Sequence, residues 1–447
     1  MEELYKSWEH SSKIFNISEN GKKTYGEFFT DLKKSREHLK KAFTLKQLFV
    51  LEASNDYQTY VKFVSCLLEK HCVFMSATYQ FVDPEFRTLL ENETQSSFIY
   101  IPADKNFNDV TNTSETNNPI ILQALKDKLS PFLVRTSGTS GNKFKFICHS
   151  AEAFVRKYHQ VQNHFHTTMA FSPADTIAGI ETLMEAITHQ NTLVSNQEKM
   201  TPLKVSELIE KEQIDYFQTT PSFLNLMLIS KAFNQDKMKT LKKIAYGSEP
   251  ALSSSLLAIK EALSHLEFKH TYGMSEIGIL STVTDQKDPA RFKFNQAIND
   301  FKIEDGALLI KTETRMLGYL NYVNQAPGWF KTGDAAELDS DGYIKILGRT
   351  DDLINLAGRK FYPYEVEDLL IRIEGAEDIS VTAEKNALIG NVIIAKFLLG
   401  ADYDEQDFRE RLKIFCETQL PSFMCPHKIL VTREPFITSR FKKDRKI

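Results

Sequence analysis

The chain has 447 residues, with 55 Lys and Arg against 59 Asp and Glu, and a formal net charge of −4. A single hydrophobic core usually stops growing near ~250 to 300 residues, so this length predicts more than one domain. A composition of 42% hydrophobic and 26% charged residues excludes wholesale disorder, and the nearly balanced charge disfavours a dedicated nucleic-acid binder.

The cysteines and the first residues indicate the compartment. Five cysteines are an odd number for a disulfide framework, and no two have the spacing of zinc or redox motifs, so we expect reduced, buried thiols. The first six residues lack the apolar core of a secretory signal, and no apolar run approaches the ~18 to 20 residues that span a bilayer. We therefore expect a cytoplasmic protein without a membrane span.

The first half of the chain alternates between helix-like stretches and short apolar runs, the pattern of parallel βα units. Residues 48–52 are a predicted strand and residues 57–69 a predicted helix. Polar residues dominate 106–118, which predicts a surface loop. The alternation resumes with a helix at 205–211, a strand at 216–219 and a helix that begins at Pro221, where proline suits the first turn.

The pattern changes near residue 303 to short strands and turns. Segments 335–338 and 343–346 flank a turn of Asp, Ser, Asp and Gly, which predicts a hairpin that ends a β-rich subdomain. Residues 351–447 follow with helix, strand, strand and helix patterns at 365–373, 379–383, 392–398 and 404–418. We therefore predict an α/β fold: a large N-terminal domain of αβ-layered sheets plus a β-rich subdomain, and a small α+β C-terminal domain.

The strongest local signal is a loop of four hydroxyl residues and two glycines. Its members are Thr136, Ser137, Gly138, Thr139, Ser140 and Gly141. Glycines let the backbone approach an anion, and the loop supplies N–H and O–H donors for phosphate oxygens. The residues that follow read as a strand, which distinguishes the loop from the helix-linked phosphate loop of other nucleotide-binding proteins. A Gly/Ser hairpin turn without a ligand is the alternative.

Further segments follow this loop in a fixed order. They are Thr271 to Glu276, Lys331 to Asp334, Gly348 to Asn355 with Gly358, and Pro363 to Glu367. With them the chain resembles the superfamily of acyl-adenylate-forming enzymes, which includes acyl-CoA synthetases, peptide-synthetase adenylation domains and luciferases. The resemblance spans nearly the whole chain.

The resemblance implies ATP and Mg²⁺ as ligands, and it assigns roles to residues of this chain. Attack of a carboxylate on the α-phosphorus needs positive charge and a metal to offset the repulsion between two anions. Glu276 would hold Mg²⁺ and is expected to be catalytic together with Lys442 and Thr136, while Asp334 would accept hydrogen bonds from the ribose hydroxyls. The nucleotide contacts that the resemblance implies are Ser137, Gly138, Thr139, Ser140, Gly141, Lys145, Gly247, Ser248, Glu249, Tyr272, Gly273, Ser275, Asp334 and Arg349.

Two departures from the family pattern leave alternatives open. Near the C-terminus Phe441 stands where the family usually has glycine before its lysine, so Lys443 rivals Lys442 as the catalytic lysine. In the phosphate loop the family's Pro-Lys pair is absent, so Lys145 and Lys143 compete for that lysine's place.

The resemblance also implies domain motion. Residues 1–350 would form the AMP-binding domain, and residues 351–447 would form a mobile lid with its hinge near Asp351. Rotation of the lid would withdraw Lys442 and bring the loop from Asn355 to Gly358 towards the site, opening a path for a thiol. Coenzyme A and the phosphopantetheine of a separate acyl or peptidyl carrier protein are both expected acceptors.

Acyl selectivity is expected to come from residues 171–179, 217–222 and 245–248. Amino-acid-activating relatives have an aspartate where this chain has Ser172, and fatty-acyl and aryl relatives commonly have a histidine where Thr176 lies. Asp175 is either a partner for a substrate amine or an N-cap of the next helix.

We predict an ATP-dependent acid–thiol ligase that activates a small carboxylic acid, with a fatty or aryl acid favoured, releases pyrophosphate and transfers the acyl group to a thiol. Two alternatives are a stand-alone amino-acid adenylation enzyme and a catalytically impaired relative that binds a nucleotide or acyl ligand. The joint presence of Glu276, Asp334, Arg349 and Lys442 favours the ligase, because a chain freed from chemistry has no physical reason to keep all four.

Overall fold

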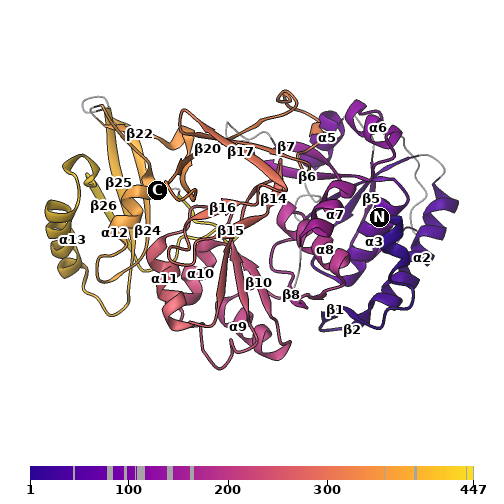
Figure 1. Cartoon of the computed structure of the whole chain (residues 1–447), viewed down its shortest axis with the longest axis horizontal. Coiled ribbons are helices and arrows are strands. Elements are labelled where there is room, and N and C mark those ends of the chain that lie inside the picture. The colour runs from indigo at the N-terminus through magenta and orange to yellow at the C-terminus, as the bar shows by residue number, and fades with distance from the viewer. Residues whose placement is uncertain are drawn as a thin grey trace.

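The computed structural model describes residues 1–43, 46–77, 84–94, 98–105, 107, 116–137, 144–161, 166–356, 358–386, 390–438 and 440–445. Figure 1 shows three parts along the long axis: indigo and purple N-terminal layers, a magenta middle, and an orange and yellow C-terminal end. Near the end of the described chain, Phe441 packs against Phe171 and Phe223 of the middle part.

The N-terminal layer contains a six-stranded sheet with the order β19-β7-β6-β4-β3-β5. Its strands are β3 (Leu48–Glu52), β4 (Cys72–Ser76), β5 (Ile99–Ile101), β6 (Pro131–Ser137), β7 (Phe144–Ser150) and β19 (Gly318–Tyr319). Strands β3 to β6 pair in parallel, whereas β6 and β7 form an antiparallel hairpin. The predicted strand at 48–52 is confirmed, and the predicted helix at 57–69 is α3 (Tyr57–Leu68), one residue shorter.

Helices surround this sheet. They are α1 (Glu2–Lys6), α2 (Tyr25–Ala42), α3, α5 (Pro84–Thr94), α6 (Pro119–Lys126) and α7 (Ala151–Gln160). Helix α2 begins at a capping box in which Thr24 and Glu27 satisfy each other's backbone N–H groups. The apolar faces of α2 and α3 belong to a large buried cluster that also contains β3 and α8 (Ile177–His189) side chains.

The middle layer is a seven-stranded sheet with the order β12-β11-β10-β8-β9-β1-β2. Its strands are β1 (Ile14–Ser18), β2 (Gly21–Thr24), β8 (Thr167–Met169), β9 (Thr192–Val194), β10 (Tyr216–Thr219), β11 (Lys243–Tyr246) and β12 (Glu267–His270). All neighbours pair in parallel except β1 and β2, an edge hairpin that sequence analysis did not predict.

The helices of the middle layer are α8, α9 (Pro202–Lys211), α10 (Pro221–Ile229) and α11 (Ser253–Ala262). The predicted strand at 216–219 and the helix start at Pro221 are confirmed. The hydroxyl of Thr220 accepts the backbone N–H of Phe223, which caps α10. In a parallel sheet of this kind, ligands bind beyond the carboxyl ends of the strands.

The β-rich subdomain lies between the middle layer and the C-terminal end (Figure 1). Its sheet has the order β15-β16-β21-β20-β18-β17, formed by β15 (Thr282–Thr284), β16 (Phe292–Phe294), β17 (Asn299–Glu304), β18 (Ala307–Thr312), β20 (Phe330–Leu338) and β21 (Ile344–Arg349). Strands β20 and β21 form the predicted hairpin, whose turn contains Gly342 at φ +81°. A second hairpin joins β13 (Tyr272–Met274) to β14 (Gly278–Leu280).

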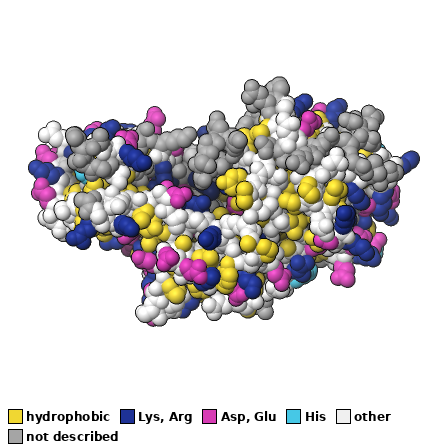
Figure 2. Space-filling model, turned by 90° about the horizontal axis from the view of Figure 1, so that it is seen from above, with side chains coloured by type: hydrophobic (Ala, Val, Ile, Leu, Met, Phe, Trp, Pro, Cys, Tyr) yellow, Lys and Arg dark blue, Asp and Glu magenta, His cyan; other side chains and the backbone are white. Residues whose placement is uncertain are grey.

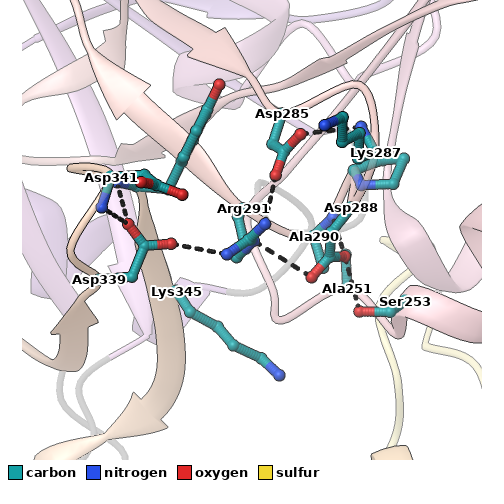
Figure 3. A network of polar contacts seen from close by, with 12 residues as sticks. Ala251, Ser253, Asp285, Lys287, Asp288, Ala290, Arg291, Asp339, Asp341 and Lys345 are labelled. Atoms are coloured by element: carbon teal, nitrogen blue, oxygen red, sulfur yellow. Dashed lines mark hydrogen bonds and ion pairs between the residues drawn. The ribbon is translucent and has the colours of Figure 1, made fainter.

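A network of ion pairs anchors this subdomain (Figure 3). The guanidinium of Arg291 contacts Asp285 at 2.5 Å, Asp339 at 2.6 Å and Asp288 at 3.4 Å. Ser253 of α11 donates to Asp288, so the network links the middle layer, β16 and the β20–β21 turn. One cation thereby holds three carboxylates that would otherwise repel one another.

The C-terminal part folds around its own hydrophobic cluster, to which the large domain adds Leu252. It comprises β22 (Ile354–Leu356), β23 (Arg359–Phe361), α12 (Pro363–Leu370), β24 (Ala376–Asn386), β25 (Gly390–Leu399), α13 (Glu405–Gln419) and β26 (Lys428–Thr432), with short 3₁₀ turns η2 (Thr350–Asp352) and η3 (Ser422–Met424). The predicted fold class is confirmed, while the domain boundary and the hinge near Asp351 stay predictions.

The surface mixes both signs of charge, and Figure 2 shows blue and magenta side chains interspersed with yellow ones over the visible face. All five cysteines are free, and Cys66, Cys72 and Cys148 are buried. Within the described part of the chain, the helices are all too short or too polar to cross a bilayer.

Candidate active site

A cavity of about 860 Å³ lies where the middle layer, the β-rich subdomain and the C-terminal part meet. Strand ends and loops from all three contribute to its wall. Among the residues that the sequence predicted for the site, the wall contains Thr136, Lys145, Ser248, Glu249, Tyr272, Gly273, Ser275, Glu276, Asp334, Arg349 and Lys442. Thr136 and Lys442, which are 306 residues apart in the chain, thus line one cavity.

The Asp334 carboxylate is positioned by the hairpin of β20 and β21. Asp334 and Arg349 lie directly opposite each other across the two strands, and Arg349 Nη1 donates to Asp334 Oδ1 at 2.8 Å. Gly333 has φ +75°, and a Cβ there would lie 3.3 Å from the guanidinium, so glycine suits both the backbone and the close approach. Burial is the largest single influence and lowers the pKa of Arg349, but the charge and hydrogen bond of Asp334, with the nearby Tyr272 and Glu276, together raise that pKa overall.

Tyr272 supplies a second partner for Asp334. Its hydroxyl donates to Asp334 Oδ2 at 2.5 Å, and its ring stacks on Phe292 with centroids 6.0 Å apart. Burial, followed by the charge of Asp334, raises the pKa of Tyr272, so the phenol stays protonated and remains a donor. The carboxylate therefore carries one donor on each oxygen and keeps its remaining lone pairs for a ligand in the cavity.

The segment from Thr271 to Glu276 follows β12 and is held by close backbone contacts. A Cβ on Gly273 would lie 2.6 Å from the carbonyl oxygen of Gly278, so only glycine fits there. The carbonyl of Ser275 accepts a hydrogen bond from His149 Nε2 at 2.7 Å, and burial lowers the pKa of His149 to about 4, which keeps its ring neutral. No local sequence pattern pointed to His149 as a support of this segment.

Glu276 is nearly buried, and its Oε1 accepts the hydroxyl of Tyr319 at 2.8 Å. Among the described residues there is no group of three or more His, Cys, Asp or Glu side chains that could enclose a metal. A single carboxylate suits Mg²⁺, which usually binds through one or two carboxylates and otherwise through water and substrate phosphates. Tyr319 lies on β19 far from any motif, so the sequence offered no signal for it.

Thr136 and Lys145 occupy paired positions on the β6–β7 hairpin. Side chains directly opposite across an antiparallel pair project from the same face, and both residues line the cavity. The ammonium of Lys145 lies 4.0 Å from the ring centroid of Tyr322 and 5.3 Å from that of Tyr319. Ser137 is the last residue of β6, whereas Gly138, Thr139, Ser140, Gly141 and Lys143 lie outside the described residues.

The segment after β11 brings the backbone close to the cavity. A Cβ on Gly247 would lie 2.2 Å from the carbonyl oxygen of Thr271, so glycine is required there. Ser248 has φ +72° and lines the cavity. Glu249 accepts the backbone N–H of Ser222 at 2.8 Å and that of Lys443 at 3.0 Å, and so ties the large domain to the C-terminal segment.

The two rival lysines have different environments. Lys442 lines the cavity, and its Nζ lies 3.5 Å from the carbonyl oxygen of Ser248. Lys443 instead pairs with Asp378 at 3.0 Å and Glu367 at 3.8 Å within the C-terminal part. Desolvation by neighbouring groups lowers the pKa of Lys442, although the residue is exposed by its surface area. The geometry favours Lys442 as the residue that faces a ligand.

The predicted N-cap role of Asp175 is wrong. The side chain of Thr176 accepts the backbone N–H of Gly179 and caps α8, one residue further along. Asp175 lies instead 3.7 Å from the guanidinium of Arg440 in the C-terminal segment. Thr176 caps the helix because its hydroxyl reaches the backbone N–H of Gly179 in the first turn. The Asp175 carboxylate instead lies near the guanidinium of Arg440.

Comparison with known proteins shows the family to which the chain belongs. Residues 72–320 match the family model described as AMP-binding enzyme. The 2-succinylbenzoate–CoA ligase of Listeria monocytogenes serotype 4b is 25% identical over 276 residues, 59% of this chain, and the chain spans only 56% of that relative's length. A second, from L. monocytogenes serovar 1/2a, is 22% identical over 425 residues, 87% of this chain and 85% of the relative.

Solved structures share the fold. An anthranilate CoA ligase in complex with anthranoyl-AMP superposes with a TM-score of 0.81 at 17% identity, covering 99% of this chain and 95% of that one. The o-succinylbenzoate CoA synthetase of Bacillus subtilis, in complex with its acyl-adenylate intermediate, gives 0.75 at 18% identity, with 98% and 96% covered. Since the family model spans more than half of the chain, the protein belongs to the AMP-binding enzyme family.

Proposed function

We propose that the protein is an ATP-dependent acid–thiol ligase, which joins a carboxylic acid to AMP with release of pyrophosphate and then transfers the acyl group to a thiol. The single observation that carries the proposal is the shared cavity. It holds the carboxylates Glu276 and Asp334 on the large domain and the cation Lys442 on the C-terminal segment.

In the proposed complex ATP binds along the large-domain wall. Asp334 accepts hydrogen bonds from the ribose hydroxyls, Arg349 holds that carboxylate in place, and Tyr272 flanks the base. Thr136 and Lys145 face the phosphates from β6 and β7. Glu276 would hold Mg²⁺, which would offset phosphate charge and ease pyrophosphate departure when bound.

Lys442 supplies the charge that the first half-reaction needs. A carboxylate and an α-phosphate repel each other, and an ammonium fixed between them lowers that repulsion more strongly in an enclosed cavity than in water. Because the pKa of Lys442 is lowered, its ammonium should lose its proton at a lower pH than an ordinary lysine does, and the pH dependence of pyrophosphate exchange tests this.

The second half-reaction needs access for a thiol. We propose that the C-terminal part turns about a hinge near Asp351, which removes Lys442 and opens the cavity. Coenzyme A is the favoured acceptor, because similar proteins are named CoA ligases. A carrier-protein phosphopantetheine is the alternative, since 57% of the chain also matches surfactin synthase subunit 2 of Bacillus subtilis at 24% identity.

The surroundings of Asp175 bear on which class of carboxylic acid the proposed enzyme would activate. Its carboxylate pairs with Arg440 at 3.7 Å, so it has a cation already and is a poor partner for the ammonium of an amino acid. We therefore favour a fatty or aryl acid over a stand-alone amino-acid adenylation enzyme.

Acid-dependent exchange of pyrophosphate into ATP, measured with Mg²⁺ and without a thiol, tests the proposal. We expect exchange with one class in a panel of fatty, aryl and amino acids. Silence across the panel, from folded protein that still binds ATP, would instead support a catalytically impaired nucleotide-binding relative.

A further inference from the structure

A second cavity of about 840 Å³ lies beyond the carboxyl ends of strands from both parallel sheets. Segments 53–58 and 195–200, which follow β3 and β9, form part of its wall together with Phe171, Ala174 and Asp175, which follow β8. These last residues belong to the segment that the sequence assigned to acyl selectivity. The cavity therefore brings that segment to a position where parallel sheets bind ligands.

Hydrogen bonds join two of the loops that border this cavity. Asn55 Nδ2 donates to the carbonyl oxygens of Ala170 at 2.7 Å and Ser172 at 3.0 Å. The loop after β3 and the loop after β8 are thus fixed to each other, and the space between them is preformed.

Phe441 adds a wall from the C-terminal segment. It lines the second cavity, while Lys442, the next residue, lines the nucleotide cavity. The segment is a tight hairpin in which Ile437 bridges Lys443 and the backbone N–H of Thr438 donates to the carbonyl of Lys442 at 2.8 Å. Phe441 has φ +59°, a conformation in which glycine is far more comfortable.

The ring of Phe441 is seated in the large domain. Its centroid lies 4.7 Å from that of Phe171 and 5.1 Å from that of Phe223, and Phe171 in turn packs on Phe217 at 5.3 Å. Its carbonyl oxygen accepts the hydroxyl of Thr220, the same hydroxyl that caps α10. A non-glycine residue in a strained conformation persists where its surroundings require it, and the aromatic seat supplies that requirement.

We propose that the ring of Phe441 is a partition between the nucleotide cavity and the second cavity, and that it restricts the acid to compact molecules such as short aliphatic or single-ring aryl acids. The inference rests on the proposed function. The acid's carboxylate lies at Lys442 and its carbon skeleton points towards Phe441, which closes the way into the second cavity. Without the ring, a longer chain passes into that cavity.

Removing the ring tests the partition. The probes are non-hydrolysable acyl-sulfamoyl adenosines with acetyl, benzoyl, decanoyl and tetradecanoyl groups, and binding is measured by calorimetry for the wild type and Phe441→Gly. The wild type should prefer the acetyl and benzoyl probes. In Phe441→Gly the affinity for the decanoyl probe relative to the acetyl probe should rise at least about tenfold. Much of the second cavity's wall is polar, so we expect only the few methylenes that reach Phe171, Ala174 and Met200 to contribute, and one methylene on an apolar wall is worth about that factor.

Two further variants keep the test decisive. Phe441→Leu retains an apolar side chain of smaller width and should give an intermediate ratio, even if the glycine variant folds poorly. Phe301→Ala is the matched control, because Phe301 packs on Phe294 at 5.2 Å in the β-rich subdomain and its removal costs aromatic packing away from both cavities.

The outcomes separate this inference from the proposed function. A decanoyl-to-acetyl ratio that is unchanged in both Phe441 variants overturns the partition, as does a wild type that binds the tetradecanoyl probe as tightly as the acetyl probe. Failure of the wild type to bind any acyl probe, while it still binds AMP, overturns the proposed ligase function and the partition with it. A larger ratio in Phe301→Ala as well would also count against the partition, because the change would not be specific to position 441.

Discussion

The two walls of the nucleotide cavity are built differently. On the large domain, Asp334 accepts hydrogen bonds from Arg349 Nη1 at 2.8 Å and from the Tyr272 hydroxyl at 2.5 Å. Arg349 lies on the paired strand β21, and Tyr272 lies on the separate β13–β14 hairpin. On the C-terminal segment, the ammonium of Lys442 lies 3.5 Å from the carbonyl oxygen of Ser248, a long hydrogen bond. The first wall is fixed before any ligand arrives, while the second depends on how the C-terminal segment docks.

This difference separates binding from chemistry. A preformed wall loses little conformational entropy when a nucleotide binds, so it suits recognition. A cation on a separate segment can be placed for one step and withdrawn for the next, which suits a reaction in two halves. Variants on the two walls should therefore affect different measurements.

The largest effect is expected from Lys442→Ala. Loss of the ammonium should slow acid-dependent pyrophosphate exchange by roughly 100- to 1000-fold, the usual consequence of removing one electrostatic contact to a developing charge. ATP affinity should change little, because the nucleotide wall is intact. Lys443→Ala serves as the control, since Lys443 pairs with Asp378 and Glu367 and should affect stability more than exchange. Equal loss of exchange in both variants would reject the assignment to Lys442.

Asp334→Asn should act on the other wall. It removes the charge that Arg349 and a ribose share, and ATP binding measured by calorimetry should weaken roughly ten- to hundredfold, as for loss of charged hydrogen bonds. Tyr272→Phe keeps the carboxylate charge and should weaken binding less. A larger loss in Tyr272→Phe than in Asp334→Asn would show that the ring, and not the carboxylate, dominates recognition.

Arg291→Ala should change stability without changing the site. Three aspartates would lose their shared cation, and we expect the free energy of unfolding to fall by about 1 to 3 kcal/mol in urea denaturation. Lys302→Ala, which breaks the exposed pair with Glu304, should cost less than about 1 kcal/mol. ATP affinity should match the wild type in both variants, and a marked loss in Arg291→Ala would mean that the network also shapes the cavity.

The smallest expected effect is an alkaline limb in the pH profile of exchange. Desolvation lowers the pKa of Lys442, so the active ammonium is present below that pKa and is lost as pH rises through it. The exchange rate should therefore decrease at a pH below the ordinary range of lysine pKa values. Lys442→Arg should move it out of the accessible range, because a guanidinium stays charged. A limb that is identical in the arginine variant would have to come from another group.

Local sequence predicted the regular elements well where a short-range cause existed. The strand at 216–219 and the helix from Pro221 were found because the alternation of short segments and a proline at the first turn both act within a few residues. Asp175 shows the limit, since two neighbouring residues could both cap α8 and only the backbone geometry selected Thr176. The β1–β2 edge hairpin was missed because β2, with the sequence Gly-Lys-Lys-Thr, carries no apolar side chain that would mark it as a strand.

The sequence by itself determined the fold class and the order of the motifs, because hydrophobic periodicity and glycines in tight turns are recognisable within a few neighbouring residues. Tertiary structure alone decided three further points: that Lys442 and not Lys443 faces the cavity, that Tyr319 holds Glu276, and that Phe441 is seated among aromatic rings of the large domain. Each of these joins segments more than 40 residues apart. Contacts at such separations depend on how whole layers pack, which no local pattern encodes.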